Sequence, residues 1–473
     1  MGADAWYTFL MNPEALSALG NLFGERLRTT LETRICYSFD ATGKKFLPDA
    51  VIYPINAEEV RQTVLLANRH RFPVVPRGAG SGFSGGSLPV HGGVVLSTER
   101  MDRIVAIDTE NLYAVVEPGV VTETLKVEAK KHGLFYPPDP ASLKFSTIGG
   151  NIAECSGGMS AVKYGVTRDY VLGLEAVLGT GELLRTGVAT AKGVVGYDLT
   201  RMIVGSEGTL GIVTRATLRL LPHPEAAVTL LAFFSGNGDA VGAVNAVVAA
   251  RVTPSAMEIM DRTAIDCVQA NAPMSLPEGT GSALLLEVDG TPDFAAREAD
   301  RLEEACRACG ALAVRRASDA VGRDDLWKLR RSISPALRRV APVKLNEDIV
   351  VPRSRLADMF AFLRDLSGRK NVRIVNFGHA GDGNIHVNIM ISGTDADETR
   401  RADEAVEEVF RKTVEMGGTI SGEHGVGISK APFFEMEVGP LGVAVMKRLK
   451  GCFDPNGILN PGKIFLEEAA VRG

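Results

Sequence analysis

A glycine-rich loop is the feature that most restricts how this 473-residue chain can fold. In the stretch PRGAGSGFSGGS, the spacing G-x-G-x-x-G runs from Gly80 to Gly85. In a nucleotide-binding fold of the Rossmann type, such a loop opens a helix. Here Pro89, Gly92 and Gly93 oppose a helix, and the run GGVVLST predicts a strand. The loop also lacks the GK[ST] ending of a P-loop, so both fold types are excluded.

The same loop remains a candidate for binding an anion. Its backbone N–H groups can face a pyrophosphate, whereas the alternative is a glycine-rich surface turn. The 51 glycines of the chain gather in clusters between strand and helix patterns, which argues against low complexity. Dense glycine in a chain with a core indicates that the backbone approaches a ligand closely or adopts positive φ.

The composition is that of a globular protein, with 45% hydrophobic residues, 23% charged residues and a net charge of −5. Lys and Arg are spread along the chain, which argues against nucleic-acid binding. No apolar run approaches the ~18 residues of a membrane span, and the first residues do not follow the signal-peptide pattern. The six cysteines form neither a disulfide framework nor an iron–sulfur motif. These features predict a cytoplasmic protein with reduced thiols.

The spacing of apolar residues predicts two α+β regions. In the first, a helix is expected from Ala57 to Phe72, a second helix ends at Gly133, and the run YVLGLEAVLGTGELLRTG predicts a hairpin. The pattern changes near residue 222, after which strands such as ALLLEVDG alternate with helices such as FAAREADRLEEACRACG. A last helix precedes the turn sequences DPNG and NPGK.

Two of the seven histidines flank the turn AGDGN in the stretch NFGHAGDGNIHVNIM. The strand patterns on both sides place His379 and His386 at the mouth of one hairpin, where two imidazoles can share an ion. The run TISGEHGVG supplies Glu423 as a third ligand, and two histidines with one carboxylate are typical of a catalytic divalent-metal site. Asp382 fits better as a turn former. The spacing alone leaves a structural role for these histidines equally open.

Four motifs occur in order between residues 50 and 220: PRGAGSGFSGG, EPGV, PPDPASLKFSTIGGNIAECSGGMSAVKYG and GSEGTLGIVT. Together they resemble the FAD domain of the vanillyl-alcohol oxidase / p-cresol methylhydroxylase flavoprotein superfamily. The resemblance implies FAD, with its pyrophosphate on the glycine loop. Members with covalent flavin commonly carry a histidine in this loop, where this chain has Phe83, so noncovalent FAD is expected.

The resemblance implies seventeen cofactor-binding residues. They are Pro76, Arg77, Gly78, Ala79, Gly80, Ser81 and Gly82 around the pyrophosphate; Ser142, Thr147, Gly149, Gly150, Asn151, Ala153 and Gly158 along the isoalloxazine and ribitol; and Glu207, Gly208 and Ile212 near the adenine half.

The later motifs FGHAGDGNIHVN, GEHGVG and FDPNGILNPGKIF resemble the FAD-linked D-2-hydroxy-acid dehydrogenases. This group includes D-lactate dehydrogenases, the flavin subunit of glycolate oxidase and D-2-hydroxyglutarate dehydrogenase, and the resemblance covers nearly the whole chain. It implies that His379, His386 and Glu423 bind a divalent metal (Zn²⁺, Mn²⁺ or Fe²⁺) and that His424 is the catalytic base. By the WxxR pattern of this group, Arg330 is the expected clamp for the substrate carboxylate. Ser334, one turn later on the same helical face, and Lys344 and Asn388 are further candidate contacts.

The resemblance also implies an α+β fold in three parts. An FAD-binding domain of the p-cresol methylhydroxylase type, built from two α+β subdomains, is expected at residues 1–222. A cap domain with an antiparallel sheet, which binds substrate and metal, is expected at 223–430. Residues 431–473 are expected to form a helical segment that packs back on the FAD-binding domain.

The predicted reaction is the oxidation of a D-2-hydroxy acid to the 2-oxo acid. A metal lowers the pKa of the substrate hydroxyl, His424 takes its proton, and the hydride goes to flavin N5. D-Lactate is the expected substrate. Glycolate and D-2-hydroxyglutarate stay open, the latter because the register of Lys344 against the lysine of those enzymes is ambiguous. An ether-lipid synthase of the same superfamily is a rival, but its run of adjacent histidines does not occur in this sequence.

Without an iron–sulfur motif of its own, the protein is expected to pass its electrons to a separate acceptor. The candidates are an iron–sulfur subunit, an electron-transferring flavoprotein, a cytochrome and a quinone. Such a partner would hold the protein at the inner membrane, and a homodimer is compatible with the sequence. A subunit that only relays electrons is the second rival, which the candidate metal ligands and base argue against.

Overall fold

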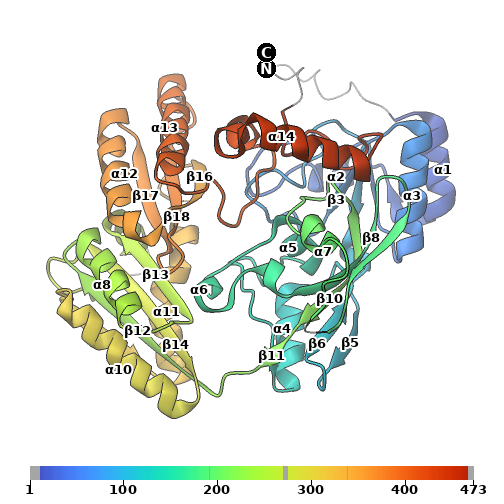
Figure 1. Cartoon of the computed structure of the whole chain (residues 1–473). Helices are drawn as coiled ribbons and strands as arrows, with labels where there is room; N and C mark the ends of the chain where they lie inside the picture. The colour runs from blue at the N-terminus through green and yellow to red at the C-terminus, as the bar shows by residue number, and fades with distance from the viewer. Residues whose placement is uncertain (1–10, 191, 270–274, 338, 467–473) are drawn as a thin grey trace. The chain divides into compact units, whose positions relative to one another are not determined.

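The computed structural model describes residues 11–190, 192–269, 275–337 and 339–466. The chain divides into two compact units (Figure 1). Unit 1 comprises Met1–Gly157, Val166–His223 and Glu423–Gly473, and unit 2 comprises Gly158–Gly165 and Pro224–Gly422. The chain therefore leaves unit 1 twice and returns to it for its last segment.

The first sheet of unit 1 has four strands in the order β1-β2-β4-β3. β2, β3 and β4 are parallel, and β1 pairs antiparallel with β2. The strands are β1 (Leu27–Arg28), β2 (Ala50–Ile52), β3 (Val74–Arg77) and β4 (Val94–Ser97). Helices α1 (Pro13–Phe23) and α3 (Ala57–His70) bury apolar side chains such as Leu19, Val60 and Val64 against it. The bounds of α3 confirm the helix expected from Ala57.

The glycine loop connects β3 to β4. Residues 78–93 contain no helix, and the chain passes from the loop directly into β4. Gly80 and Gly85 have φ of 65° and 85°, a region that favours glycine. The structure thus confirms that this loop is not of the Rossmann type.

The second sheet of unit 1 has five antiparallel strands in the order β5-β6-β10-β8-β9. The strands are β5 (Ile104–Asp108), β6 (Tyr113–Val116), β8 (Val171–Val177), β9 (Leu183–Gly187) and β10 (Ile212–Arg219). β8 and β9 form the expected hairpin. Helix α4 (Thr122–Lys131) ends just before Gly133, whose φ is 70°. Two short helices, α5 (Ile148–Glu154) and α7 (Leu199–Ile203), and the strand pair β7 (Leu134–Phe135) and β11 (Leu221–Pro222) complete this part.

The last segment of the chain packs within unit 1. Helix α14 (Phe434–Phe453) is interrupted at Gly439, where φ is 70°. Beyond it, Leu459 forms a parallel bridge with Val74 of β3. The Nδ2 amide of Asn460 donates to the carbonyl oxygens of Gly86 and Glu207, each at 2.7 Å. These contacts confirm that the C-terminal helical segment returns to the part of unit 1 that carries the glycine loop.

Unit 2 contains a seven-stranded antiparallel sheet in the order β15-β12-β14-β13-β17-β18-β16. The strands are β12 (Ala226–Phe234), β13 (Ala256–Asp261), β14 (Ser282–Gly290), β15 (Ala313–Ala317), β16 (Val343–Val350), β17 (Arg373–His379) and β18 (Asn384–Ile391). The helices are α6 (Ala161–Tyr164), α8 (Asn237–Ala249), α9 (Arg262–Gln269), α10 (Pro292–Ala308), α11 (Ala320–Leu337), α12 (Leu356–Lys370) and α13 (Ala396–Glu415).

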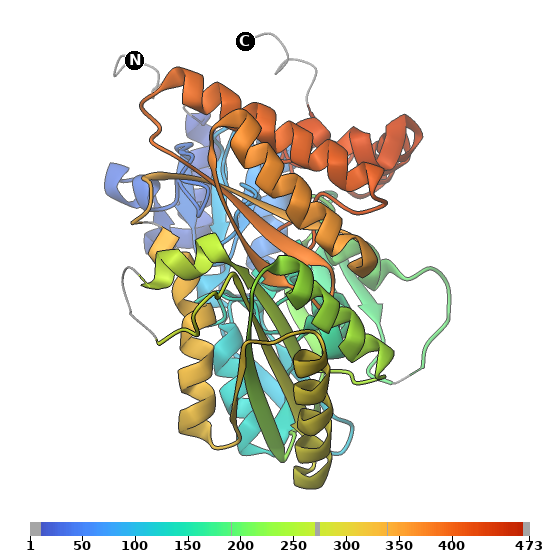
Figure 2. The ribbon, with the colours of Figure 1, turned by 90° about the vertical axis from the view of Figure 1, so that its left-hand side faces the viewer.

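Helices cover both faces of this sheet. α9 and α11 bury Ile265, Leu329 and Ile333 in one core with Leu285 and Phe377 of the strands. Figure 2 shows α8 and α10 on the side of the sheet opposite to α11. The mixed α+β architecture with antiparallel sheets is the fold class expected from the sequence.

Candidate active site

The hairpin of β17 and β18 carries His379 and His386. His379 is the last residue of β17, and His386 is the third residue of β18. The two rings are nearly perpendicular, at 88°, with their centroids 5.1 Å apart and their Nε2 atoms 3.3 Å apart. Both side chains are buried. The turn 380–383 therefore brings the two imidazoles together, as the sequence suggested.

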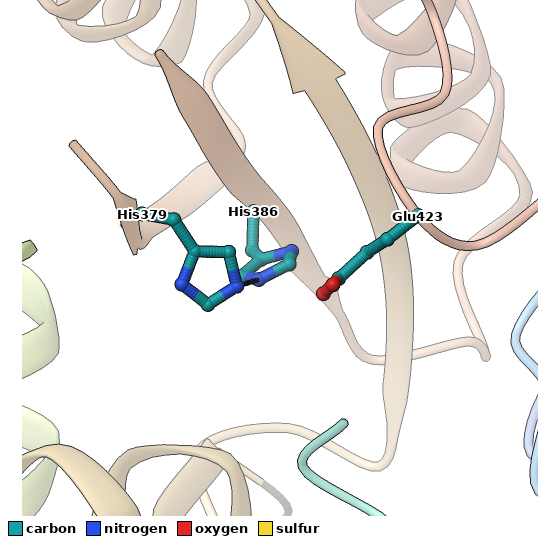
Figure 3. A group of neighbouring side chains, drawn as sticks. All are labelled: His379, His386 and Glu423. Carbon is teal, nitrogen blue, oxygen red and sulfur yellow. Dashed lines mark hydrogen bonds between the residues drawn. The ribbon is translucent and has the colours of Figure 1, made fainter. Parts of the chain in front are cut away.

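Glu423 joins the two histidines. It follows Gly422, whose backbone N–H donates to Oδ2 of Asp348 at 2.9 Å. One ligand atom each of His379, His386 and Glu423 lies within 4.8 Å of the other two. Figure 3 shows the Glu423 carboxylate turned toward the imidazoles. Two imidazole nitrogens and one carboxylate oxygen fit a divalent ion of the Zn²⁺, Mn²⁺ or Fe²⁺ type, with positions left for substrate.

Each histidine lies directly opposite a buried carboxylate on a neighbouring strand. Glu258 of β13 pairs with His379, and Asp348 of β16 pairs with His386. Oε1 of Glu258 lies 2.6 Å from Nδ1 of His379, and Oδ1 of Asp348 lies 3.7 Å from Nδ1 of His386. With Nδ1–H donating to Glu258, the Nε2 lone pair of His379 is available to an ion. Sequence reasoning missed both carboxylates.

Glu258 also contacts Arg330, the candidate clamp for the substrate carboxylate. Nε of Arg330 donates to Oε2 of Glu258 at 2.6 Å, and the guanidinium lies 4.6 Å from the ring centroid of Phe377. Burial alone would raise the pKa of Glu258, but the neighbouring His379 and Arg330 hold that pKa below its ordinary value. Glu258 therefore joins a candidate metal ligand to a candidate substrate contact.

The other candidate substrate contacts belong to the same sheet face or to the helix over it. Asn388 comes two residues after His386 in β18, and Lys344 comes four residues before Asp348 in β16. His386 and Asp348 are paired across the two strands, so all four side chains share one face. Asn388 is fully buried, and Lys344 is half-buried. Ser334 lies one turn after Arg330 in α11 and is exposed.

A cavity within unit 1 collects most of the residues that the resemblance assigned to FAD. The expected residues that line it are Pro76, Arg77, Gly78, Ala79, Gly80, Ser81, Gly82, Ser142, Thr147, Gly149, Gly150, Asn151, Ala153, Glu207, Gly208 and Ile212. Gly158 is not among its lining residues and belongs to a segment of unit 2. Phe83, Glu154 and His424 also line the cavity.

The cavity wall fits a nucleotide pyrophosphate. In the described part of the chain, no hydrogen bond uses the backbone N–H groups of residues 79–82. A Cβ atom on Gly78 would lie 2.3 Å from Oγ1 of Thr147, the residue that caps α5. Glycine thus lets the loop approach α5 closely, and the available N–H groups can bind an anion.

His424 stands in this cavity beside the glycine loop. Its ring centroid lies 5.1 Å from that of Phe83, with 33° between the planes. The following residues Val426 and Gly427 donate their backbone N–H groups to the carboxylate of Glu207, each at 2.7 Å. Glu207, assigned to the adenine half by resemblance, therefore contacts the GEHGVG motif that carries His424.

Comparison with known families gives two matches. Residues 48–187 match the family described as "FAD binding domain", and residues 223–464 match "FAD linked oxidases, C-terminal domain".

Curated relatives cover nearly the full chain. The glycolate oxidase subunit GlcD of Bacillus subtilis is 45% identical over 440 residues, which are 93% of this chain and 94% of the relative. The D-lactate dehydrogenase of Anaerostipes hadrus is 36% identical over 89% of this chain and 90% of its own. The D-lactate dehydrogenase of Archaeoglobus fulgidus is 36% identical over 90% of this chain and 95% of its own.

Solved structures share the fold. p-Cresol methylhydroxylase with substrate bound superposes with a TM-score of 0.79 at 19% identity, covering 96% of both chains. An alkyldihydroxyacetonephosphate synthase superposes with a TM-score of 0.75 at 20% identity, and the match covers 98% of this chain and 88% of its own. Among the described residues, no helix has the length and apolar character needed to cross a membrane.

Proposed function

Since this chain belongs to the FAD-linked oxidase family and is an FAD-dependent oxidoreductase, we propose that it oxidises a D-2-hydroxy acid to the 2-oxo acid, with D-lactate as the substrate. The observation that carries the proposal is that ligand atoms of His379, His386 and Glu423 lie within 4.8 Å of one another. Glu423 directly precedes His424 in the chain. A cation site and an imidazole base next to each other suit the removal of a hydroxyl proton.

In the proposed mechanism, His379, His386 and Glu423 hold a divalent ion. The ion supplies a Lewis acid for the substrate hydroxyl, and noncovalently bound FAD supplies the hydride acceptor. His424 takes the hydroxyl proton, because imidazole titrates near neutral pH. Glu258 orients His379 by accepting from its Nδ1–H at 2.6 Å.

Arg330 is proposed to bind the substrate carboxylate. Its Nε is held by Glu258, so the guanidinium has a fixed orientation above Phe377. A fixed, planar guanidinium is well suited to a carboxylate, because two N–H groups can donate in parallel. Asn388 and Lys344 are proposed as further polar contacts, since they share the sheet face of His386. Ser334 is proposed as a contact one turn from Arg330.

The electrons are proposed to leave through a partner protein or a quinone. The relatives from Bacillus subtilis and Escherichia coli are named subunits of a glycolate oxidase, which supports a partner such as an iron–sulfur subunit. An electron-transferring flavoprotein and a cytochrome are the other proposed acceptors. The proposed location is the cytoplasm. A partner that is bound to the inner membrane would hold the protein at that membrane.

Glycolate is the second candidate substrate. The observation in its favour is the 45% identity to a protein named as a glycolate oxidase subunit, against 36% to proteins named D-lactate dehydrogenase. The two acids differ by one methyl group, and an apolar contact of that size changes binding by only about 1–3 kcal/mol.

The test is anaerobic reduction of the bound flavin by D-lactate, L-lactate, glycolate and D-2-hydroxyglutarate in parallel. Because the flavin itself reports the reaction, no acceptor has to be known. D-Lactate is expected to bleach the flavin fastest. Faster bleaching by glycolate or D-2-hydroxyglutarate would reassign the substrate, and the absence of bleaching by all four acids would contradict the proposed function.

A further inference from the structure

A pair of carboxyl groups in the cavity of unit 1 has no part in the mechanism above. Glu154 ends α5, and Glu207 lies in the turn GSEG with φ of 53°. Both residues line the cavity. A Cβ atom on Gly425 would lie 2.1 Å from Oε2 of Glu154 and 3.0 Å from Oε1 of Glu207. The two carboxyl groups therefore reach the same point, next to the residue that follows His424.

The two carboxyl groups differ in their hydrogen bonds. The oxygens of Glu207 accept from the backbone N–H groups of Val426 and Gly427, each at 2.7 Å. Oε2 of Glu154 is buried and has no hydrogen-bond partner among the described residues. Two N–H donors stabilise a carboxylate as the anion, whereas a buried oxygen without a donor favours the neutral acid. A proton shared by the pair therefore belongs on Glu154.

The surrounding charges favour the same assignment. Burial raises the pKa of Glu154 well above its ordinary value, and Glu207 and Asp40 raise that pKa further, while Lys430 opposes them. Burial raises the pKa of Glu207 as well, but its two N–H donors, Lys463 and Lys430 counter the effect. A carboxylic acid that stays neutral in such a site can donate a hydrogen bond.

Glycine at two positions leaves room for this acid. A Cβ atom on Gly86 of the glycine loop would lie 2.6 Å from Oε1 of Glu154, and one on Gly425 would lie 2.1 Å from Oε2. Gly425 follows the proposed base His424, and a base must lie near the reacting end of the cofactor. The Glu154 carboxyl is therefore at that end of the cavity, and in this proposal the neighbouring Glu207 lies there too, rather than at the adenine half that the resemblance implied.

We propose that Glu154 is a further residue of the cofactor site, whose carboxyl group donates a hydrogen bond to the flavin ring while the fixed carboxylate of Glu207 keeps the proton on Glu154. A donor at the ring stabilises the electron-rich reduced flavin and so favours hydride transfer to it. The inference rests on the proposed function for the position of His424, and on FAD in this cavity.

The test is the midpoint potential of the bound flavin, measured by stepwise chemical reduction without any hydroxy acid. It therefore remains valid even if the proposed substrate is wrong. Glu154→Gln replaces the O–H donor of the neutral acid with the N–H donor of a neutral amide. The midpoint potential of this variant is therefore expected to equal that of the wild type. Glu154→Leu removes the donor and is expected to lower the potential. Glu110→Gln, in the exposed turn between β5 and β6, is the control and is expected to change nothing.

Two results would overturn the proposal. A raised potential in Glu154→Gln would mean that Glu154 is an anion, and an unchanged potential in Glu154→Leu would mean that it does not interact with the flavin. If the Leu variant loses FAD, infrared difference spectra of flavin reduction decide instead. A C=O stretching band of a protonated carboxylic acid is expected in the wild type and not in Glu154→Gln, and its absence from the wild type contradicts the proposal.

Discussion

The carboxylate of Glu258 lies 2.6 Å from Nδ1 of His379, directly across the pair formed by β13 and β17. The same carboxylate accepts from Nε of Arg330, also at 2.6 Å. One buried acid thus orients a proposed metal ligand and the proposed substrate clamp. Replacing Glu258 can therefore change both metal binding and the stability of the fold. A control variant is needed to separate the two effects.

Glu258→Gln is expected to weaken binding of the divalent ion by roughly 10–100-fold, the usual cost of removing a partner of a metal-ligating histidine. The amide cannot accept from both His379 and Arg330. Isothermal titration of metal-free protein with Zn²⁺ or Mn²⁺ measures the change. The control is Glu287→Gln, because Glu287 of β14 belongs to the same sheet and accepts from Arg323 and Trp327 of α11, and no histidine is its partner among the described residues. Equal affinities in both variants would exclude the proposed role of Glu258.

Metal binding is expected to stabilise the folded protein. An ion present at about 100 times its Kd adds about 2.7 kcal/mol to the free energy of unfolding, which raises Tm. His386→Ala removes one ligand and is expected to lose this shift, while His132→Ala, at the exposed end of α4, is expected to keep it. Thermal unfolding of chelator-treated protein with and without added metal is the measurement. A full shift in His386→Ala would remove His386 from the ligand set.

His424→Ala is expected to slow flavin reduction by substrate about 10²–10⁴-fold, the usual contribution of a general base. FAD content and reduction by dithionite are expected to be unchanged, since neither requires proton removal from the hydroxyl. Single-turnover absorbance under anaerobic conditions gives the rate. Bleaching at the wild-type rate would show that another group takes the proton.

Noncovalent binding predicts that acid denaturation releases the flavin. The glycine loop carries Phe83 and has no histidine that could bond to the flavin, and the ring centroid of Phe83 lies 5.1 Å from that of His424. After precipitation in acid, the yellow colour is expected in the supernatant. Flavin that stays with the precipitated chain would mean that a covalent bond exists.

The parts of the site that the sequence predicted are local in the chain. The glycine loop is one continuous stretch between β3 and β4, and His379 and His386 belong to one hairpin. Turn residues and strand periodicity act over a few positions, so these features follow from neighbouring residues. The α+β fold class followed in the same way from the patterns of strands and helices.

The partners of the histidines are not local. Glu258 and His379 are 121 positions apart, and they meet because β13 and β17 are neighbours in the sheet. The residues around Glu258 contain no pattern that predicts that β13 is the neighbour of β17. The pairing of Arg330 with Glu258 and the approach of Glu154 to Gly425 depend on similarly distant contacts. The sequence therefore predicted the candidate ligands but not the acids that orient them.

The most direct measurement of the central claim is the anaerobic rate of flavin reduction by D-lactate in metal-loaded and metal-stripped protein, with L-lactate alongside. A Lewis acid at the hydroxyl supplies several kcal/mol, so stripping the metal is expected to slow the reaction by roughly a hundredfold or more. Adding the metal back is expected to restore the rate of flavin reduction. L-Lactate is expected to reduce the flavin far more slowly than D-lactate. Reduction that is equally fast without metal, or equally fast with L-lactate, would contradict a metal-assisted oxidation of a D-2-hydroxy acid.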